Sequence, residues 1–122
     1  MISSNSTRQT AAPFPVPSNW QVYISSGGRP NTTGFMQITS WQNNQFQGTL
    51  NFRGVPLLVT GNWDPSTLMV RFESPYVAFQ GRLSSFADST ARYWKIEGRY
   101  LSKVSSDYPG AQGTFIATTT TL

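Results

Sequence analysis

The sequence predicts an all-β protein, an up-and-down antiparallel β-barrel of eight strands. Three observations lead to this prediction: a glycine-centred repeat, the lack of helical apolar periodicity, and turn-forming residues at regular intervals. The repeat is a large apolar residue, a polar residue, glycine, another polar residue and another large apolar residue. Its five copies are centred on Gly48, Gly61, Gly81, Gly98 and Gly113.

The repeat predicts strands that bend. Residues i, i+2 and i+4 of a strand share one face, so each copy places its glycine between two apolar side chains on the buried side. Glycine inside a strand usually marks a bend or a close approach of backbones. Five such positions on successive strands are what a small meander needs in order to curl and close.

The first four strands are separated by two glycine-containing corners and one asparagine turn. We expect these strands at residues 19–26, 33–42, 45–53 and 57–63. Gly27-Gly28-Arg29-Pro30 ends the first strand, and Asn43-Asn44 turns the second directly into the third. Gly54-Val55-Pro56 then makes the corner before the fourth strand.

The last four strands follow turns rich in Asp, Ser, Pro and Gly. We expect these strands at residues 68–73, 76–85, 93–103 and 112–119. Asp64-Pro65-Ser66 precedes the fifth strand, Ser74-Pro75 the sixth and Ala87-Asp88-Ser89 the seventh. Ser106-Asp107-Tyr108-Pro109-Gly110 precedes the eighth. All connections are short, so successive strands are expected to be antiparallel neighbours.

Alternation along the strands assigns most side chains to the inner or the outer face. The large residues predicted to point inward include Trp20, Val22, Ile24, Phe46, Leu50, Phe52, Trp63, Val70, Phe72, Phe79, Trp94, Ile96, Tyr100 and Phe115. The second strand is ambiguous, with Met36 and Ile38 on one face and Phe35 and Trp41 on the other. An eight-stranded barrel can be filled by such side chains or can hold one small ligand.

Length and composition bound the function. We expect a flexible N-terminal tail at residues 1–18 and a single barrel domain at residues 19–122. The chain has neither cysteine nor histidine, so it lacks disulfides, thiolate or imidazole metal ligands and the usual general base, and we expect no cofactor. Charged residues make up only 11% of the chain, and uncharged polar residues are abundant. Such a surface is common outside cells and indicates a secreted or periplasmic protein.

The acidic residues do not indicate an active site. Asp64, Asp88 and Asp107 lie in turns, where an Asp side chain commonly bonds nearby backbone groups. Glu73 lies at a strand end, and Glu97 faces outward as an expected cross-strand partner of basic residues. We therefore expect a protein that is not an enzyme.

The repeat resembles the strand pattern of the avidin–streptavidin family, most closely in Val59–Asp64 and Ile96–Tyr100. The resemblance covers roughly residues 19–119 and implies a calycin-type barrel that binds a small molecule. Lipocalin-like barrels share these motifs, and cyanobacterial anti-viral lectin barrels carry something similar to residues 48–54.

The biotin site of the avidin–streptavidin family is largely missing. Val22 and Leu50 occupy positions where the family has an asparagine and a tyrosine, and Gly113 replaces an aspartate. Ser26 and Phe79 match the family's serine and aromatic positions. The resemblance therefore implies the barrel and a ligand other than biotin.

Two binding functions remain open from the sequence. One is a small hydrophobic or cyclic molecule held in the barrel's mouth, with walls from Trp20, Trp63, Phe79 and Trp94 and a polar contact from Ser26. The alternative is a glycan-binding or protein-interaction module with a filled barrel. Its contacts would come from exposed aromatic residues, which we expect to be Phe35, Trp41 and Tyr108.

The residues predicted to face outward bear on two kinds of partner, nucleic acid and a second copy of the chain. Five basic residues face outward on neighbouring strands: Arg71, Arg82, Lys95, Arg99 and Lys103. Because they are dispersed among serines and threonines, they are more typical of a solvated face than of a nucleic-acid site. Four apolar residues also face outward: Leu58, Tyr93, Leu101 and Ile116. Such a surface favours a homo-oligomer, a dimer or a tetramer.

Overall fold

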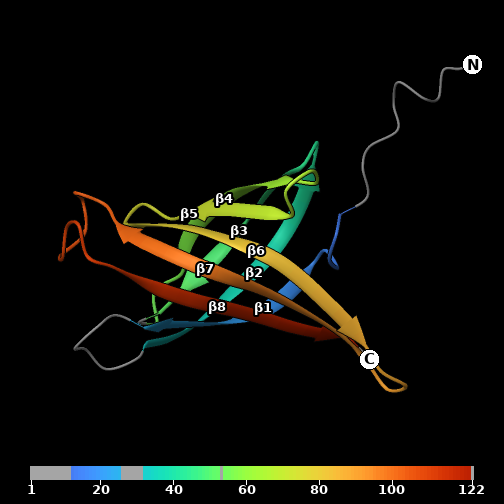
Figure 1. Cartoon of the computed structure of the whole chain (residues 1–122). Helices are drawn as coiled ribbons and strands as arrows, with labels where there is room; N and C mark the ends of the chain where they lie inside the picture. The colour runs from blue at the N-terminus through green and yellow to red at the C-terminus, as the bar shows by residue number, and fades with distance from the viewer. Residues whose placement is uncertain (1–11, 26–31, 53, 122) are drawn as a thin grey trace, which may run out of the picture.

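The computed structural model describes residues 12–25, 32–52 and 54–121, and within these ranges the chain forms a closed antiparallel barrel. Its strands are β1 (Ser18–Ser25), β2 (Thr32–Gln42), β3 (Gln45–Asn51), β4 (Leu57–Asp64), β5 (Met69–Glu73), β6 (Val77–Ala87), β7 (Arg92–Ser102) and β8 (Gln112–Thr121). They follow one another around the barrel in chain order, and β1 pairs with β8 to close it (Figure 1). The predicted fold class is confirmed. No helix long and apolar enough to cross a bilayer occurs in the described residues.

The observed strand bounds differ from the predicted ones by at most two residues, because turn-forming residues delimit the strands. Asn43 and Asn44 both have positive φ, at 54° and 63°. Two such residues form the tight hairpin whose twist matches that of the flanking strands, and asparagine tolerates this backbone better than most residues. The β2–β3 turn is therefore set locally by two adjacent asparagines.

A β-bulge resolves the ambiguity of the second strand. The pairing of β2 with β3 shifts register between Ile38 and Ser40. An extra residue on one strand reverses the alternation of faces beyond it. Met36 and Ile38 therefore point inward before the bulge, and Trp41 packs on the core side after it, whereas Phe35 is 62% exposed on the outer face.

The barrel interior is filled by aromatic and aliphatic side chains. The rings of Phe72 and Phe79 stack with their centroids 4.6 Å apart, and Phe115 meets both edge-on at 5.5 Å and 5.1 Å. Around these rings the inward residues of every strand are buried as the alternation predicts, Ile24 and Phe52 only partly. Large rings that pack in this way supply most of the apolar area that the fold buries.

The repeat glycines lie where neighbouring backbones come closest. A Cβ atom added to Gly48 would overlap the carbonyl oxygen of Gln37, and one added to Gly98 would overlap that of Gln80. Gly81 lies opposite Gly98 in the β6–β7 pairing, and its added Cβ would lie 2.8 Å from the carbonyl oxygen of Glu97. The predicted close approach at the repeat glycines is confirmed.

Residues 12–18, placed in the predicted flexible tail, adopt a different arrangement. Ser18 begins β1, and Phe14 is only 3% exposed within the core cluster, with Val16 packed against it. The segment contains three prolines, at positions 13, 15 and 17, which cannot donate to a sheet ladder. Strand patterns therefore do not predict that this segment packs on the barrel. Residues 1–11 of the predicted tail lie outside the described residues.

Valine at the repeat glycines should destabilise the barrel. Gly48→Val and Gly98→Val force a side chain against a neighbouring carbonyl, and each should lower the free energy of unfolding by about 1–3 kcal/mol, as overpacking does. The controls are Gln47→Val and Gln80→Val, which place the same side chain at exposed, outward-facing positions of β3 and β6. Urea titrations that gave equal midpoints for glycine and glutamine variants would contradict the close-approach explanation.

Candidate binding site

The described residues predicted to wall a pocket are buried side chains, and they are not gathered around one cavity: Phe79 borders one surface hollow and Trp20 another. Trp20, Trp63, Phe79 and Trp94 are all at most 8% exposed, and Ser26 lies outside the described residues. The three tryptophans lie near the same end of the barrel, at the start of β1 and β7 and the end of β4. Phe79 lies deeper, against Phe72, Phe115 and Tyr100. The predicted wall is thus divided between one end of the barrel and its middle.

The end of the barrel that carries the tryptophans is here called the tryptophan end. It comprises the starts of β1, β3, β5 and β7 and the ends of β2, β4, β6 and β8. Figure 1 shows the blue segment before β1 at this end, together with the β6–β7 turn and the end of β8. The ring of Phe14 lies against Trp20, with the centroids 5.3 Å apart. The chain's own N-terminal segment therefore covers this end.

Of the three aromatic residues expected to be exposed, two are exposed. Phe35 is 62% exposed on the outer face of β2, and Tyr108 is 53% exposed in the β7–β8 connection. The expectation for Trp41 is wrong: it is half-buried and its ring is parallel to that of Phe46, at 6.4 Å. The bulge in β2 is the reason, because it directs Trp41 toward the core.

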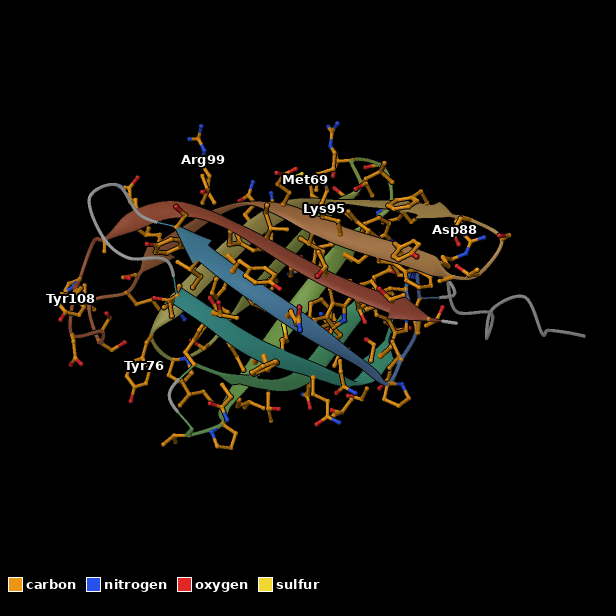
Figure 2. All side chains as sticks on the ribbon, turned by 90° about the horizontal axis from the view of Figure 1, so that it is seen from below. Met69, Tyr76, Asp88, Lys95, Arg99 and Tyr108 are labelled. Carbon is orange, nitrogen blue, oxygen red and sulfur yellow. The ribbon has the colours of Figure 1, made fainter. Side chains whose placement is uncertain are left out.

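A large hollow in the described residues lies on the outside of the barrel. It is a broad groove of ≈ 1440 Å³ that follows the outer face of the sheet, chiefly across β3 to β7. Its charged lining residues are Arg71, Glu73, Arg82, Glu97 and Arg99, and its amide and hydroxyl residues are Ser40, Gln42, Asn43, Gln45, Gln47, Thr60, Asn62, Gln80 and Gln112. We call this surface the outer groove. Figure 2 shows Arg99 pointing away from the barrel on this side.

Strand register brings the arginines of the outer groove together. Arg71 lies opposite Gln80, and Gln80 lies opposite Arg99, so two arginines flank one glutamine across three strands. The Nε–H of Arg71 donates to Oε1 of Gln80 at 3.3 Å. Arg82 lies on the same face, two residues beyond Gln80. With strands about 4.8 Å apart, the backbones of all three arginines lie within about 10 Å of one another.

The groove keeps an excess of positive charge. Glu97 pairs with Lys95 at 3.5 Å along its own strand, which differs from the cross-strand pairing expected for it, and Glu73 pairs with Lys103 at 3.2 Å. Neither of these ion pairs, the two found among the described residues, contains an arginine. Among the described residues, no carboxylate pairs with the three guanidinium groups, and only the Nε–H of Arg71 is engaged, by Gln80.

The sequence predicts these arginines on the outer face of neighbouring strands, and the strand register shows that they are grouped rather than dispersed. In the copies of the repeat centred on Gly81 and Gly98, the residue after glycine is an arginine. These two glycines lie opposite each other, so their polar neighbours share one patch of the outer face. The arginines are dispersed along the chain and gathered only by strand pairing.

The acidic residues of the two turns at the tryptophan end serve local structure. Asp64 Oδ1 accepts hydrogen bonds from the hydroxyl and the backbone N–H of Ser66, and these bonds lower the pKa of Asp64. Asp88, which caps the β6–β7 turn (Figure 2), accepts from the hydroxyl and N–H of Thr90 and from the N–H of Ala91. These bonds, those from Thr90 foremost, lower the pKa of Asp88 to about 2.

No metal site emerges from the acidic residues either. In the part of the chain that the structure describes, no three His, Cys, Asp or Glu side chains gather as metal ligands would. That the protein is not an enzyme stays a prediction.

Comparisons of the chain with protein-family models, with curated proteins and with solved structures find no match. The eight-stranded antiparallel barrel, which the resemblance to avidin and streptavidin implies, is present in the structure. Membership of the avidin–streptavidin family is not shown.

Truncation of Phe79 should behave as the loss of a core side chain. Phe79→Ala should reduce the free energy of unfolding by about 3–5 kcal/mol, because the ring packs against three other rings and would leave a cavity. Phe35→Ala, at an exposed position of the outer face, is the matched control and should change it by less than about 0.5 kcal/mol. Equal unfolding midpoints for the two variants would contradict a filled interior.

The low pKa of Asp88 makes part of the stability dependent on pH. A carboxyl whose pKa falls from 3.8 to about 2 on folding stabilises the fold above pH 4, and this contribution is lost as the pH falls toward 2. Asp88→Asn should therefore unfold at a lower temperature than the parent at pH 7, with the difference shrinking between pH 4 and pH 2. Carbon-13 NMR titration of the Asp88 carboxyl measures the pKa directly, and a value near 3.8 would refute the explanation.

Proposed function

We propose that this protein is a non-enzymatic binding module that holds an acidic oligosaccharide, one bearing carboxylate or sulfate groups, in the outer groove. This is the glycan-binding alternative that the sequence leaves open. The observation that supports it most is the set of three guanidinium groups that share the groove without carboxylate partners among the described residues.

The filled interior favours this alternative over a small molecule inside the barrel. A ligand within an eight-stranded barrel needs space that side chains would otherwise occupy. Here the rings of Phe72, Phe79 and Phe115 occupy the middle, and Phe14 covers the tryptophan end. The outer face is therefore the better place for a ligand of appreciable size.

The chemistry of the groove matches an acidic sugar. A guanidinium group is planar and binds carboxylate or sulfate through two parallel N–H···O bonds. The glutamine and asparagine side chains around the arginines both donate and accept, as the hydroxyl groups of a sugar require. The combination favours a ligand with anionic groups and many hydroxyls.

The same groove is poorly suited to single-stranded nucleic acid. Such ligands are bound by stacking of their bases on exposed aromatic rings as well as by basic side chains. The aromatic residues that border the groove are Phe46, Phe72, Phe79 and Tyr100, and each is at most 8% exposed. We therefore favour the sugar, which accords with the secreted or periplasmic location proposed from composition.

Self-association remains a proposal. Leu58 and Leu101 are 62% and 48% exposed on the outer face, as the alternation predicts. Tyr93 is half-buried and stacks on Phe86, which is 65% exposed, with the centroids 4.6 Å apart. These exposed apolar residues support a homo-oligomer, in which part of the outer face would be covered by a second copy.

Binding of a heparin-derived hexasaccharide tests the function. Isothermal titration should show binding by the parent chain and weaker binding by the triple variant Arg71→Gln, Arg82→Gln, Arg99→Gln. Exposed charge contacts are worth up to about 1 kcal/mol each, so the expected loss is up to about a hundredfold. Arg92→Gln removes an exposed arginine outside the groove and should leave the affinity unchanged.

Three results would overturn this function. They are no binding of the hexasaccharide at low salt, equal affinity of the parent and the triple variant, and equal affinity for an uncharged maltohexaose. A further arm uses oligothymidylate of matched charge. Tighter binding of this DNA than of the sugar would assign the groove to nucleic acid instead.

A further inference from the structure

We propose that the tryptophan end of the barrel is a binding site for a peptide in which an aromatic residue is flanked by prolines. The chain's own Pro13-Phe14-Pro15 is then the resident occupant of this site. The tryptophan end is apolar and aromatic, whereas the outer groove is polar and cationic. The two sites are therefore proposed independently of each other.

The receptor for the occupant's ring is built from three strands. Phe14 meets Trp20 of β1 at 5.3 Å, Trp41 of β2 at 5.7 Å and Phe46 of β3 at 6.0 Å between ring centroids. All three contacts are edge-on, with interplanar angles of 85° to 87°. Edge-on geometry is the preferred arrangement of aromatic pairs, so the site fits an aromatic side chain better than an aliphatic one of similar size.

A fourth strand recognises the backbone of the occupant. The indole N–H of Trp94 on β7 donates to the carbonyl oxygen of Pro13 at 2.9 Å. Proline-rich peptides are extended before they bind, and they commonly dock in grooves lined by aromatic side chains. The tryptophan end combines an aromatic lining with an indole donor aimed at a carbonyl beside a proline.

Within the described residues, the occupant is held by side-chain contacts and not by a sheet ladder, so it can be exchanged without opening the sheet. Pro13, Pro15 and Pro17 have no N–H to donate. No backbone-to-backbone hydrogen bond joins residues 12–17 to the rest of the described chain. Its anchors among the described residues include the ring of Phe14, the half-buried Val16 and the bond from Trp94.

The resident segment is tethered to its site, which has a consequence for the test. Tethering gives the segment a high effective concentration, so a free peptide competes poorly against it in the parent chain. Weakening the segment without touching the receptor should therefore expose the binding activity. Phe14→Ala does this, because Phe14 belongs to the occupant and all four receptor residues stay in place.

The experiment uses the full-length chain and a fluorescein-labelled hexapeptide that copies residues 12–17, Ala-Pro-Phe-Pro-Val-Pro. Fluorescence polarisation should show at least tenfold tighter binding to Phe14→Ala than to the parent. The matched control is Phe35→Ala, which removes an exposed ring from the outer face and should bind as the parent does. The hexapeptide with alanine in place of phenylalanine should not bind measurably.

A second variant tests the proposal independently in case Phe14→Ala does not fold. Val16→Asp loosens the resident segment, leaves Phe14 and every receptor residue unchanged, and should also increase affinity for the hexapeptide. Adding Trp94→Phe to Phe14→Ala keeps a ring but removes the indole donor, and should weaken the gained binding several-fold. Circular dichroism confirms that each variant is folded before binding is measured.

Two results would overturn the proposal. One is that neither folded variant binds the hexapeptide more tightly than the parent does. The other is that N-acetylphenylalaninamide competes as well as the hexapeptide, mole for mole, which would show that the prolines carry no recognition. Affinity of Phe14→Ala for the heparin hexasaccharide should equal that of the parent, so failure here and failure of the outer groove are distinguishable.

Discussion

Contact between neighbouring backbones at the repeat glycines is the constraint on which the rest of this barrel depends. Gly81 and Gly98 face each other across β6 and β7, and Gly48 lies against the Gln37 carbonyl of β2. A side chain at these positions would hold the strands apart or flatten them. The sheet can therefore curl tightly enough for β1 to reach β8, and the interior that results is narrow.

A narrow interior determines where ligands can bind. Rings contributed by β5, β6 and β8 fill the middle, so ligand recognition is left to the outer face and the ends. On the outer face, strand pairing turns separated arginines into one cationic groove. At the tryptophan end, four strands contribute the groups that hold Phe14. The two surfaces differ in polarity and suit different ligands.

Local chemistry in the sequence was enough to predict the fold, because adjacent turn residues such as Asn43 and Asn44 delimit the strands and alternation assigns their faces. The bulge in β2 was not predictable, because the residues around it have no distinctive composition. It shows only in the shifted pairing of β2 with β3. Phe14 was missed because its flanking prolines resemble a linker. Arg71, Arg82 and Arg99 were predicted to face outward on neighbouring strands, but their grouping in one groove depends on the register across β5, β6 and β7, which the sequence does not show.

The position of Phe14 in the chain reverses the order in which its site is made. Residues 12–17 leave the ribosome before every strand that holds them, and Trp94 follows about eighty residues later. At typical rates of synthesis the segment waits several seconds without its receptor. Its full set of contacts needs β1, β2, β3 and β7 together, so the part of the described chain that is synthesised first completes its packing only after β7 has been made.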